Sequence, residues 1–231
     1  MKVSIHQPNF LPHVGFFNKA AQSDLFVIYD LAQYVRDRFD NRNRIKGANG
    51  PFWLTVPVRA KDSFKKRFRD VGLPPSGAWR DKHLKSLQMC YSRTPYFRRY
   101  FDGLRDIYRG PSERLAELSI ALIDFLNDAF GIDTRTVRTT SLGLDQTLQS
   151  TEMIIQILRR VRADTYLSGP SGRKYLDLGL FEQEGITVQF QKFEHPRYRQ
   201  LFGDFVPNMA AIDLLFNEGE RAAALVAGRQ G

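Results

Sequence analysis

The sequence contains a single cysteine, Cys90, among its 231 residues. One thiol cannot form an intrachain disulfide, and it excludes zinc or iron–sulfur sites built from several cysteines. A chain without these features is typical of a reducing compartment. Cys90 stands near Leu87, Met89 and Tyr91 in a segment with helical spacing, which favours a core position over a reactive thiol.

Long apolar runs are also lacking. No segment approaches the ~20 consecutive apolar residues that a membrane-spanning helix requires. His6 and Pro8 interrupt the N-terminal residues before the apolar stretch of a signal peptide can build up. We therefore expect a cytoplasmic protein without membrane insertion.

Acidic residues are the minority, because 25 Asp and Glu stand against 34 Lys and Arg, a formal net charge of +9 at pH 7. This balance suits phosphates, nucleotides, nucleic acids or acidic glycans, and charge alone does not select among them. Hydrophobic residues make up 42% of the chain. That content supports the core of one large domain and excludes global disorder.

The order of the apolar segments predicts an α/β fold. A strand over residues 2–6, a short helix over 16–22 and an apolar strand over 24–30 open the chain. This succession is typical of a parallel sheet. We expect a three-layer, mainly parallel, Rossmann-like sheet. Its remaining strands are expected at residues 52–58, 134–139, 164–168 and 187–190.

The middle of the chain is expected to be helical. The clearest helix covers residues 112–130, with Ser112 as its N-cap and Gly131 just beyond its end. The other expected helices cover residues 79–91, 95–108, 149–161, 209–216 and 218–226. We infer one domain over residues 1–231, with a helical insertion at 78–131.

Polar residues follow several of the expected strands, where ligands bind in open α/β sheets. His6 and Asp30 are the candidate catalytic residues, since a strand-end imidazole or carboxylate can exchange protons with a substrate. A merely hydrogen-bonded histidine is the alternative for His6. The candidate binding residues at these strand ends are Gln7, Gln33, Tyr34, Ser168, Gly169, Ser171 and Gly172.

The turn Ser168-Gly169-Pro170-Ser171-Gly172 resembles a phosphate-binding element. Its glycines let backbone N–H groups approach an anion, and its two hydroxyls add donors. The alternative is a tight turn that needs glycine for backbone geometry alone. The spacing to the following lysine excludes a P-loop.

Residues 33–50 form an arginine-rich passage that includes Arg36 and Arg38. In an extended conformation Arg42, Arg44 and Lys46 project to one side and Asn43 to the other. A row of cations suits a phosphate or carboxylate. A solvated face or a single-stranded nucleic-acid site would use the same residues.

The last polar cluster includes Asn208 and Asp213, of which Asp213 shares a helix face with Asn217. This cluster is expected either to brace a site or to form a structural network. The sequence identifies no cofactor and no metal site. It remains compatible with a nucleotide, or with Mg²⁺ held through Asp30 or Asp213.

Taken together, the motifs resemble the WbqC-like protein family over nearly the whole chain. The resemblance rests on His6-Gln7-Pro8-Asn9-Phe10-Leu11-Pro12, Asp30, Gln33-Tyr34, Asn41-Arg42-Asn43-Arg44-Ile45-Lys46, Lys82-His83, Tyr166-Leu167-Ser168-Gly169, Tyr175-Leu176-Asp177 and Asp213-Leu214-Leu215-Phe216-Asn217. It adds Lys82, His83 and Tyr175 to the candidate binding residues. His13 stands where the family more often has an aromatic residue, so it is a poor candidate for an essential group.

The resemblance implies a bacterial protein from gene clusters for O-antigen, lipopolysaccharide and other surface glycans, or for natural products. We expect a transferase with a small phosphorylated or carboxylated substrate. The expected reaction is acyl or aminoacyl transfer to an amino-sugar nucleotide, with a carrier protein or CoA as the donor. The alternatives are a basic module that binds single-stranded nucleic acid, which we consider the weaker hypothesis, and a scaffold without catalysis.

Overall fold

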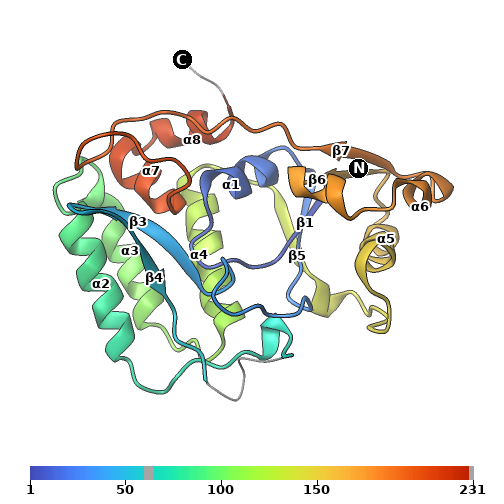
Figure 1. The fold of residues 1–231 in the computed structure, drawn as a ribbon, viewed down its shortest axis with the longest axis horizontal. Helices are drawn as coiled ribbons and strands as arrows, with labels where there is room; N and C mark the ends of the chain where they lie inside the picture. The colour runs from blue at the N-terminus through green and yellow to red at the C-terminus, as the bar shows by residue number, and fades with distance from the viewer. Residues whose placement is uncertain (60–64, 229–231) are drawn as a thin grey trace.

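The computed structural model describes residues 1–59 and 65–228 and contains a five-stranded, wholly parallel sheet (Figure 1). The order across the sheet is β5-β2-β1-β6-β7. The strands are β1 (Lys2–His6), β2 (Leu25–Ile28), β5 (Arg135–Arg138), β6 (Thr165–Ser168) and β7 (Thr187–Phe190). This arrangement confirms the expected α/β class with a mainly parallel sheet.

The strand expected at residues 52–58 lies outside this sheet. It is β4 (Gly50–Thr55), which pairs antiparallel with β3 (Arg42–Gly47) in a separate hairpin. Gly47 pairs with Gly50 across a two-residue connection, and Gly50 has a φ of +96° that suits a tight hairpin turn. The arginine-rich passage thus contains a strand, in which Arg42 and Arg44 are half-buried and Lys46 is buried.

The helical middle of the chain consists of α2 (Ala78–Tyr91), α3 (Phe97–Arg109) and α4 (Leu115–Ala129). Ser112 does not cap α4. The N-cap is Arg114, whose backbone N–H donates to the Glu117 carboxylate over 3.3 Å. Gly131 follows the helix with a φ of +63°, as expected for a left-handed terminating residue.

Two hydrophobic cores cover the two faces of the sheet. Leu25 and Val27 of β2 point into the core beneath α5 (Ser150–Arg160) and α6 (Leu178–Gln183). Phe26 and Ile28 point into the larger core on the other face. That core takes in α1 (Val14–Ala21), α2–α4, α7 (Ala211–Glu218) and α8 (Arg221–Val226). The result is the expected three-layer architecture (Figure 1).

A buried polar network ties the C-terminal loop to α7. The Asp213 carboxylate is 1% exposed and accepts hydrogen bonds from the Tyr91 hydroxyl (2.9 Å), the Tyr198 hydroxyl (2.8 Å) and Gln200 Nε2 (2.9 Å). Burial raises the pKa of Asp213 even though these bonds and nearby Lys46 favour its charged form. Asp213 therefore joins α7 to the end of α2, through Tyr91, and to the loop that carries Tyr198 and Gln200.

We predict that Asp213→Ala lowers the free energy of unfolding by about 3 kcal/mol or more, because three buried donors lose their acceptor. Tyr198→Phe removes one of these bonds and should cost about 1 kcal/mol. Urea denaturation monitored by circular dichroism measures both changes. A loss below about 1 kcal/mol in Asp213→Ala would contradict the assigned role.

Candidate functional site

The order of the strands places a crevice between β1 and β6. The chain builds β2 and β5 on one side of β1, then returns to build β6 and β7 on the other side. Such a reversal is the usual ligand position in open α/β sheets, at the carboxyl ends of the strands. The switch point therefore lies beside His6 and Ser168.

The pairing registers show that β1 and β6 separate toward this end. Backbone pairing between them covers only Lys2 with Thr165 and Val3 with Tyr166. By contrast, β1 pairs with β2 as far as His6, and β6 pairs with β7 as far as Ser168. Divergence of the two strands leaves space at their carboxyl ends.

A cavity of about 480 Å³ occupies this space, and we call it the switch-point cavity. Its lining residues are Ile5, His6, Gln7, Lys19, Tyr29, Arg38, Ser150, Ile154, Tyr166, Gly169, Ser171 and Tyr175. Among the residues expected from the sequence, His6, Gln7, Gly169, Ser171 and Tyr175 come together here. Sequence reasoning did not single out Lys19, Tyr29 or Ser150 as functional residues, and it noted Arg38 only as part of the basic passage.

His6 is a neutral imidazole on the cavity wall. Its Nδ1 lies 3.0 Å from the Gln7 backbone oxygen. Since a carbonyl can only accept, Nδ1 carries the proton and Nε2 keeps a lone pair. Burial, followed by the charge of Lys19, lowers the pKa of His6 well below its usual range. His6 thus offers a neutral Nε2 lone pair to a substrate, while the same burial makes it a weaker base than an exposed histidine.

Lys19 is the most unusual charged group of the site. It projects from α1, is only 3% exposed, and donates from Nζ to the Ile5 backbone oxygen over 3.1 Å. In the part of the chain that the structure describes, no carboxylate pairs with it. Burial lowers the pKa of Lys19 from 10.5 to about 7. Near neutral pH its amine is therefore poised between the charged and neutral forms.

Other polar groups on the wall favour an anion. Arg38 adds an exposed guanidinium. Ser150 begins α5, so the positive end of that helix dipole opens onto the cavity. At Gly169 the place of a missing Cβ has no other atom within 4 Å, so a ligand can approach the backbone there.

Within the glycine-rich turn of residues 168–172, some residues line the cavity and others serve the packing of the turn itself. A Cβ on Gly172 would lie 2.1 Å from Ser168 Oγ, and the Gly172 N–H donates to the Gly169 oxygen over 3.0 Å. Close packing inside the turn therefore accounts for Gly172. Ser168 is 1% exposed and directs its hydroxyl to the Gly169 oxygen, so neither Ser168 nor Gly172 lines the cavity.

Asp30 also lies outside the cavity lining. Its carboxylate accepts from the Thr139 hydroxyl (2.7 Å), the Thr140 hydroxyl (2.8 Å) and the Thr140 backbone N–H (3.1 Å). These contacts fasten the turn after β5 to the end of β2. Asp30 therefore holds two parts of the backbone together and does not line the candidate site.

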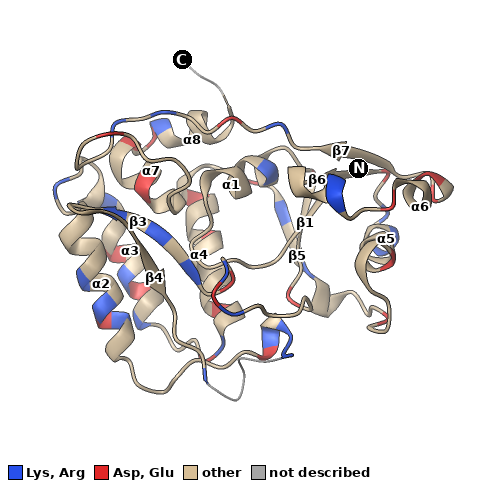
Figure 2. Ribbon diagram, in the orientation of Figure 1, with Lys and Arg blue, Asp and Glu red and all other residues tan. Residues whose placement is uncertain are grey.

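The expected cationic row lies on the hairpin, where Figure 2 shows basic residues along β3. The guanidinium carbons of Arg42 and Arg44 lie 4.4 and 5.9 Å from the Trp53 ring centre. Lys46 is 2% exposed and donates to the Gly203 and Asp204 backbone oxygens. Asn43 Nδ2 donates to the Leu11 oxygen over 2.6 Å. None of the four lines the switch-point cavity.

The remaining candidates lie apart from the cavity as well. His83 is buried between the Thr55 oxygen and the Tyr108 hydroxyl, and burial lowers its pKa to about 4. Its neighbour Lys82 is exposed on α2. The other positions are Gln33, in an isolated bridge with Arg67, Tyr34, buried against Phe68, and Asn208, exposed with a φ of +60°.

His13 has a structural position of its own. It is the N-cap of α1, where its Nδ1 accepts from the Gly15 N–H over 3.0 Å. Burial, together with the charges of His195 and Lys19, lowers the pKa of His13 to about 4. Its neutral ring fixes the start of the helix that carries Lys19.

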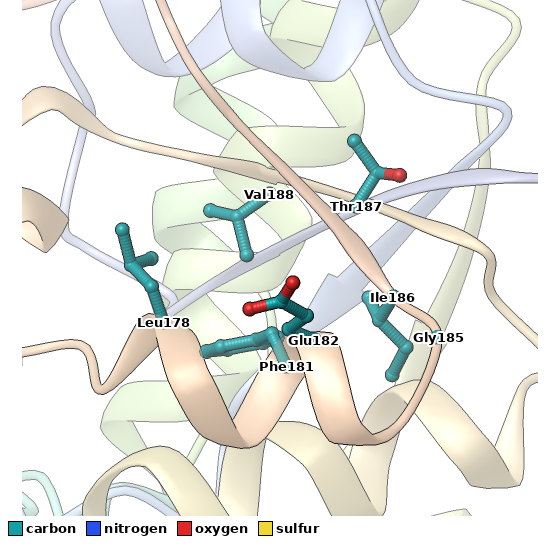
Figure 3. A pocket seen from close by; sticks show the side chains of 7 residues that line it. All are labelled: Leu178, Phe181, Glu182, Gly185, Ile186, Thr187 and Val188. Atoms are coloured by element: carbon teal, nitrogen blue, oxygen red, sulfur yellow. The ribbon is translucent and has the colours of Figure 1, made fainter.

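A second hollow, of about 390 Å³, lies between α6 and β7 (Figure 3). Glu182 is the one titratable side chain among its seven lining residues. Converging polar groups distinguish a catalytic site from a packing defect. The switch-point cavity has them, and this hollow does not.

Neither a metal cluster nor a membrane span is found in the part of the chain that the structure describes. No group of three or more His, Cys, Asp and Glu side chains there could hold a metal ion. Within residues 1–59 and 65–228, no helix is both long and apolar enough to cross a membrane.

Comparison with known proteins places this architecture in a family. The model of the WbqC-like protein family matches residues 7–224. The chain belongs to the WbqC-like protein family. It is 35% identical over 223 residues to the uncharacterized protein Rv1507c of Mycobacterium tuberculosis (strain ATCC 25618 / H37Rv), covering 96% of this chain and 95% of that protein. No solved structure matches the chain significantly.

The family motifs divide between the cavity and the fold. His6 and Gln7 of the first motif, and Gly169 and Tyr175 of later ones, line the switch-point cavity. The Asp213 motif instead forms the buried network with Tyr91 and Tyr198. The residues on which the resemblance rests thus include both cavity-lining and buried core positions.

We predict that Lys19→Met stabilises the protein at pH 7.5 and changes how its stability depends on pH. The unfolded chain has the ordinary lysine pKa of 10.5 and the folded chain about 7. Between these values the unfolded state binds more protons, so the free energy of unfolding rises with pH. Lys19 contributes at most about 1.4 kcal/mol per pH unit to this rise in the free energy of unfolding.

Urea denaturation at pH 7.5 and 9.5 measures this effect as a difference between the two proteins. Between these two pH values the free energy of unfolding of the wild type should rise by about 2 kcal/mol more than that of Lys19→Met. Groups other than Lys19 cancel in the comparison. Equal pH dependence of the two proteins would show that Lys19 is not buried as an unpaired amine.

Proposed function

We propose that this protein is a group-transfer enzyme that binds a small phosphorylated or carboxylated substrate in the switch-point cavity. One observation carries the proposal: a neutral histidine, His6, shares this cavity with two basic side chains, Lys19 and Arg38. A base and anion-binding groups on one wall are the components that transfer to a charged acceptor needs.

Substrate binding would restore the charge balance of the cavity. An anionic group beside Lys19 offsets the effect of burial and favours the charged ammonium. Arg38 and the N-terminus of α5 provide further attraction within the same cavity. The attraction to Lys19 and the attraction to Arg38 and α5 both require a negative charge on the ligand, because no carboxylate among the described residues lines the cavity.

Acyl or aminoacyl transfer to an amino-sugar nucleotide fits these groups. The acceptor nitrogen attacks the acyl carbonyl carbon, its proton passes to Nε2 of His6, and the bond to the donor's leaving group breaks. A carrier-protein or CoA thiol would be that leaving group. Family membership supports a setting in bacterial glycan or secondary-metabolite biosynthesis.

The hairpin supports a second candidate function. Arg42 and Arg44 lie over Trp53, and Phe39 lies 5.9 Å from the same ring, measured between ring centres. Phe39 and Trp53 are 42% and 43% exposed. Basic groups around exposed rings are the composition that single-stranded nucleic acids bind. None of these four residues lines the switch-point cavity, so variants can distinguish the two hypotheses.

We predict that a nucleotide sugar raises the melting temperature of the protein, and that Arg38→Gln weakens this stabilisation. A ligand at 100 times its Kd contributes about 2.7 kcal/mol. For a chain of this size that corresponds to a shift of roughly 5–10 °C. Differential scanning fluorimetry, with and without Mg²⁺, measures the shift for nucleotide sugars, ATP, acyl-CoA and a single-stranded oligonucleotide.

Arg44→Gln is the matched control, because it removes the same charge from the hairpin. The enzyme proposal requires the nucleotide-sugar shift to survive in Arg44→Gln and to fall in Arg38→Gln. Stabilisation by the oligonucleotide alone, lost in Arg44→Gln and reduced by salt, would instead support the nucleic-acid function.

A further inference from the structure

The switch-point cavity contains an amine, that of Lys19, which the proposed acyl transfer uses only for its charge and not as a nucleophile. Lys19 is on the wall of the cavity, 3% exposed, and its Nζ makes a single hydrogen bond, to the Ile5 oxygen. The charge of Lys19 acts on the imidazoles of His6 and His13, and burial is the main cause that lowers the pKa of both and keeps them neutral. Among the described residues no carboxylate holds this amine in its charged form.

These surroundings favour the chemistry of a free amine. An amine that donates one N–H to a carbonyl still has its lone pair for attack on carbon. A lysine desolvated in such a pocket is activated as a nucleophile toward carbonyl compounds. An ordinary surface lysine lacks this reactivity near neutral pH, because almost all of it is protonated.

We propose that Lys19 condenses with the carbonyl group of a small anionic aldehyde or ketone to form an imine in the switch-point cavity. The Nζ lone pair attacks the carbonyl carbon, and the carbonyl oxygen takes up a proton to give a carbinolamine. Loss of that hydroxyl and of an N–H proton as water leaves the carbon–nitrogen double bond. His6 Nε2 is the acceptor in the same cavity for the proton that the nitrogen releases.

The anionic class of the substrate follows from the rest of the cavity. Arg38 and the N-terminus of α5, with Ser150, are placed to bind a phosphate or carboxylate on the same molecule. This part of the inference rests on the proposed anion site, whereas imine formation at Lys19 goes beyond the proposed acyl transfer. The two parts can fail separately.

Reductive trapping with glyoxylate, a small aldehyde with a carboxylate, tests the proposal on the full chain. The protein is treated with glyoxylate and sodium cyanoborohydride at pH 7.5, and modified lysines are quantified by peptide mass spectrometry. Lys19 should be modified about 10-fold or more faster than exposed Lys82 and Lys85, because a pKa near 7 leaves most of its amine neutral. Labelling of Lys19 no faster than of Lys82 would overturn the proposal.

Two controls separate the parts of the inference. Acetaldehyde lacks the anion and should label Lys19 more slowly than glyoxylate, and inorganic phosphate should protect Lys19 but not Lys82. Fast labelling of Lys19 by both aldehydes without protection would support the imine and refute the anionic class. Thermal stabilisation by nucleotide sugars without any selective labelling would refute the imine and leave the proposed transfer function standing.

A matched variant excludes a general effect on surface lysines. Lys82→Arg should leave the labelling rate of Lys19 unchanged, while Lys19→Arg should abolish the fast phase and leave the slow labelling of Lys85. The wild-type comparison between Lys19 and Lys82 stays decisive even if Lys19→Arg fails to fold. A fast phase that persists in a folded Lys19→Arg protein would contradict the assignment.

Discussion

The candidate site exists because β1 pairs unequally with its two neighbours. It pairs with β2 from Val3 to its last residue, His6, but with β6 only through Lys2 and Val3. Strands β1 and β6 diverge at the switch point, where the chain adds β6 on the side of β1 opposite to β2. Their carboxyl ends therefore open a cavity, and the residues that follow them become its walls.

This geometry explains why Lys19 is buried against the Ile5 oxygen and the Phe26 ring, with no carboxylate partner among the described residues. Helix α1 connects β1 to β2 and packs over the diverging end of β1, so a side chain projecting from it reaches the Ile5 oxygen. Burying an amine without a counter-charge opposes folding. A bound anion or a covalent partner would remove that opposition. Stability and function are thus expected to conflict at this residue, as they do at many binding sites.

The sequence was sufficient for the fold class and for part of the lining of the candidate cavity. Alternation in residues 2–6 and the strand–helix–strand opening predicted the parallel sheet, and the rule for strand ends found His6, Gln7, Gly169 and Ser171. It could not separate Asp30 from these residues, because a strand-end carboxylate looks the same whether it faces a ligand or the hydroxyls of Thr139 and Thr140.

Lys19 could have been found from one local signal. It is the one charged residue in the helix Val14–Ala21, which is otherwise apolar except for Asn18. The surroundings of Arg42 and Arg44 could not have been predicted. Alternation predicts that they share one side of a strand, but not that both lie over the Trp53 ring. Long-range contacts such as these depend on packing that no local pattern contains.

Amide chemical-shift mapping tests most directly whether the switch-point cavity is the substrate site. A nucleotide sugar is titrated into ¹⁵N-labelled protein, and the changes are followed residue by residue. We expect the largest changes at Gln7, Lys19, Gly169 and Ser171, on both sides of the divergence between β1 and β6. Changes confined to the hairpin, from Arg42 to Thr55, would contradict this assignment of the site.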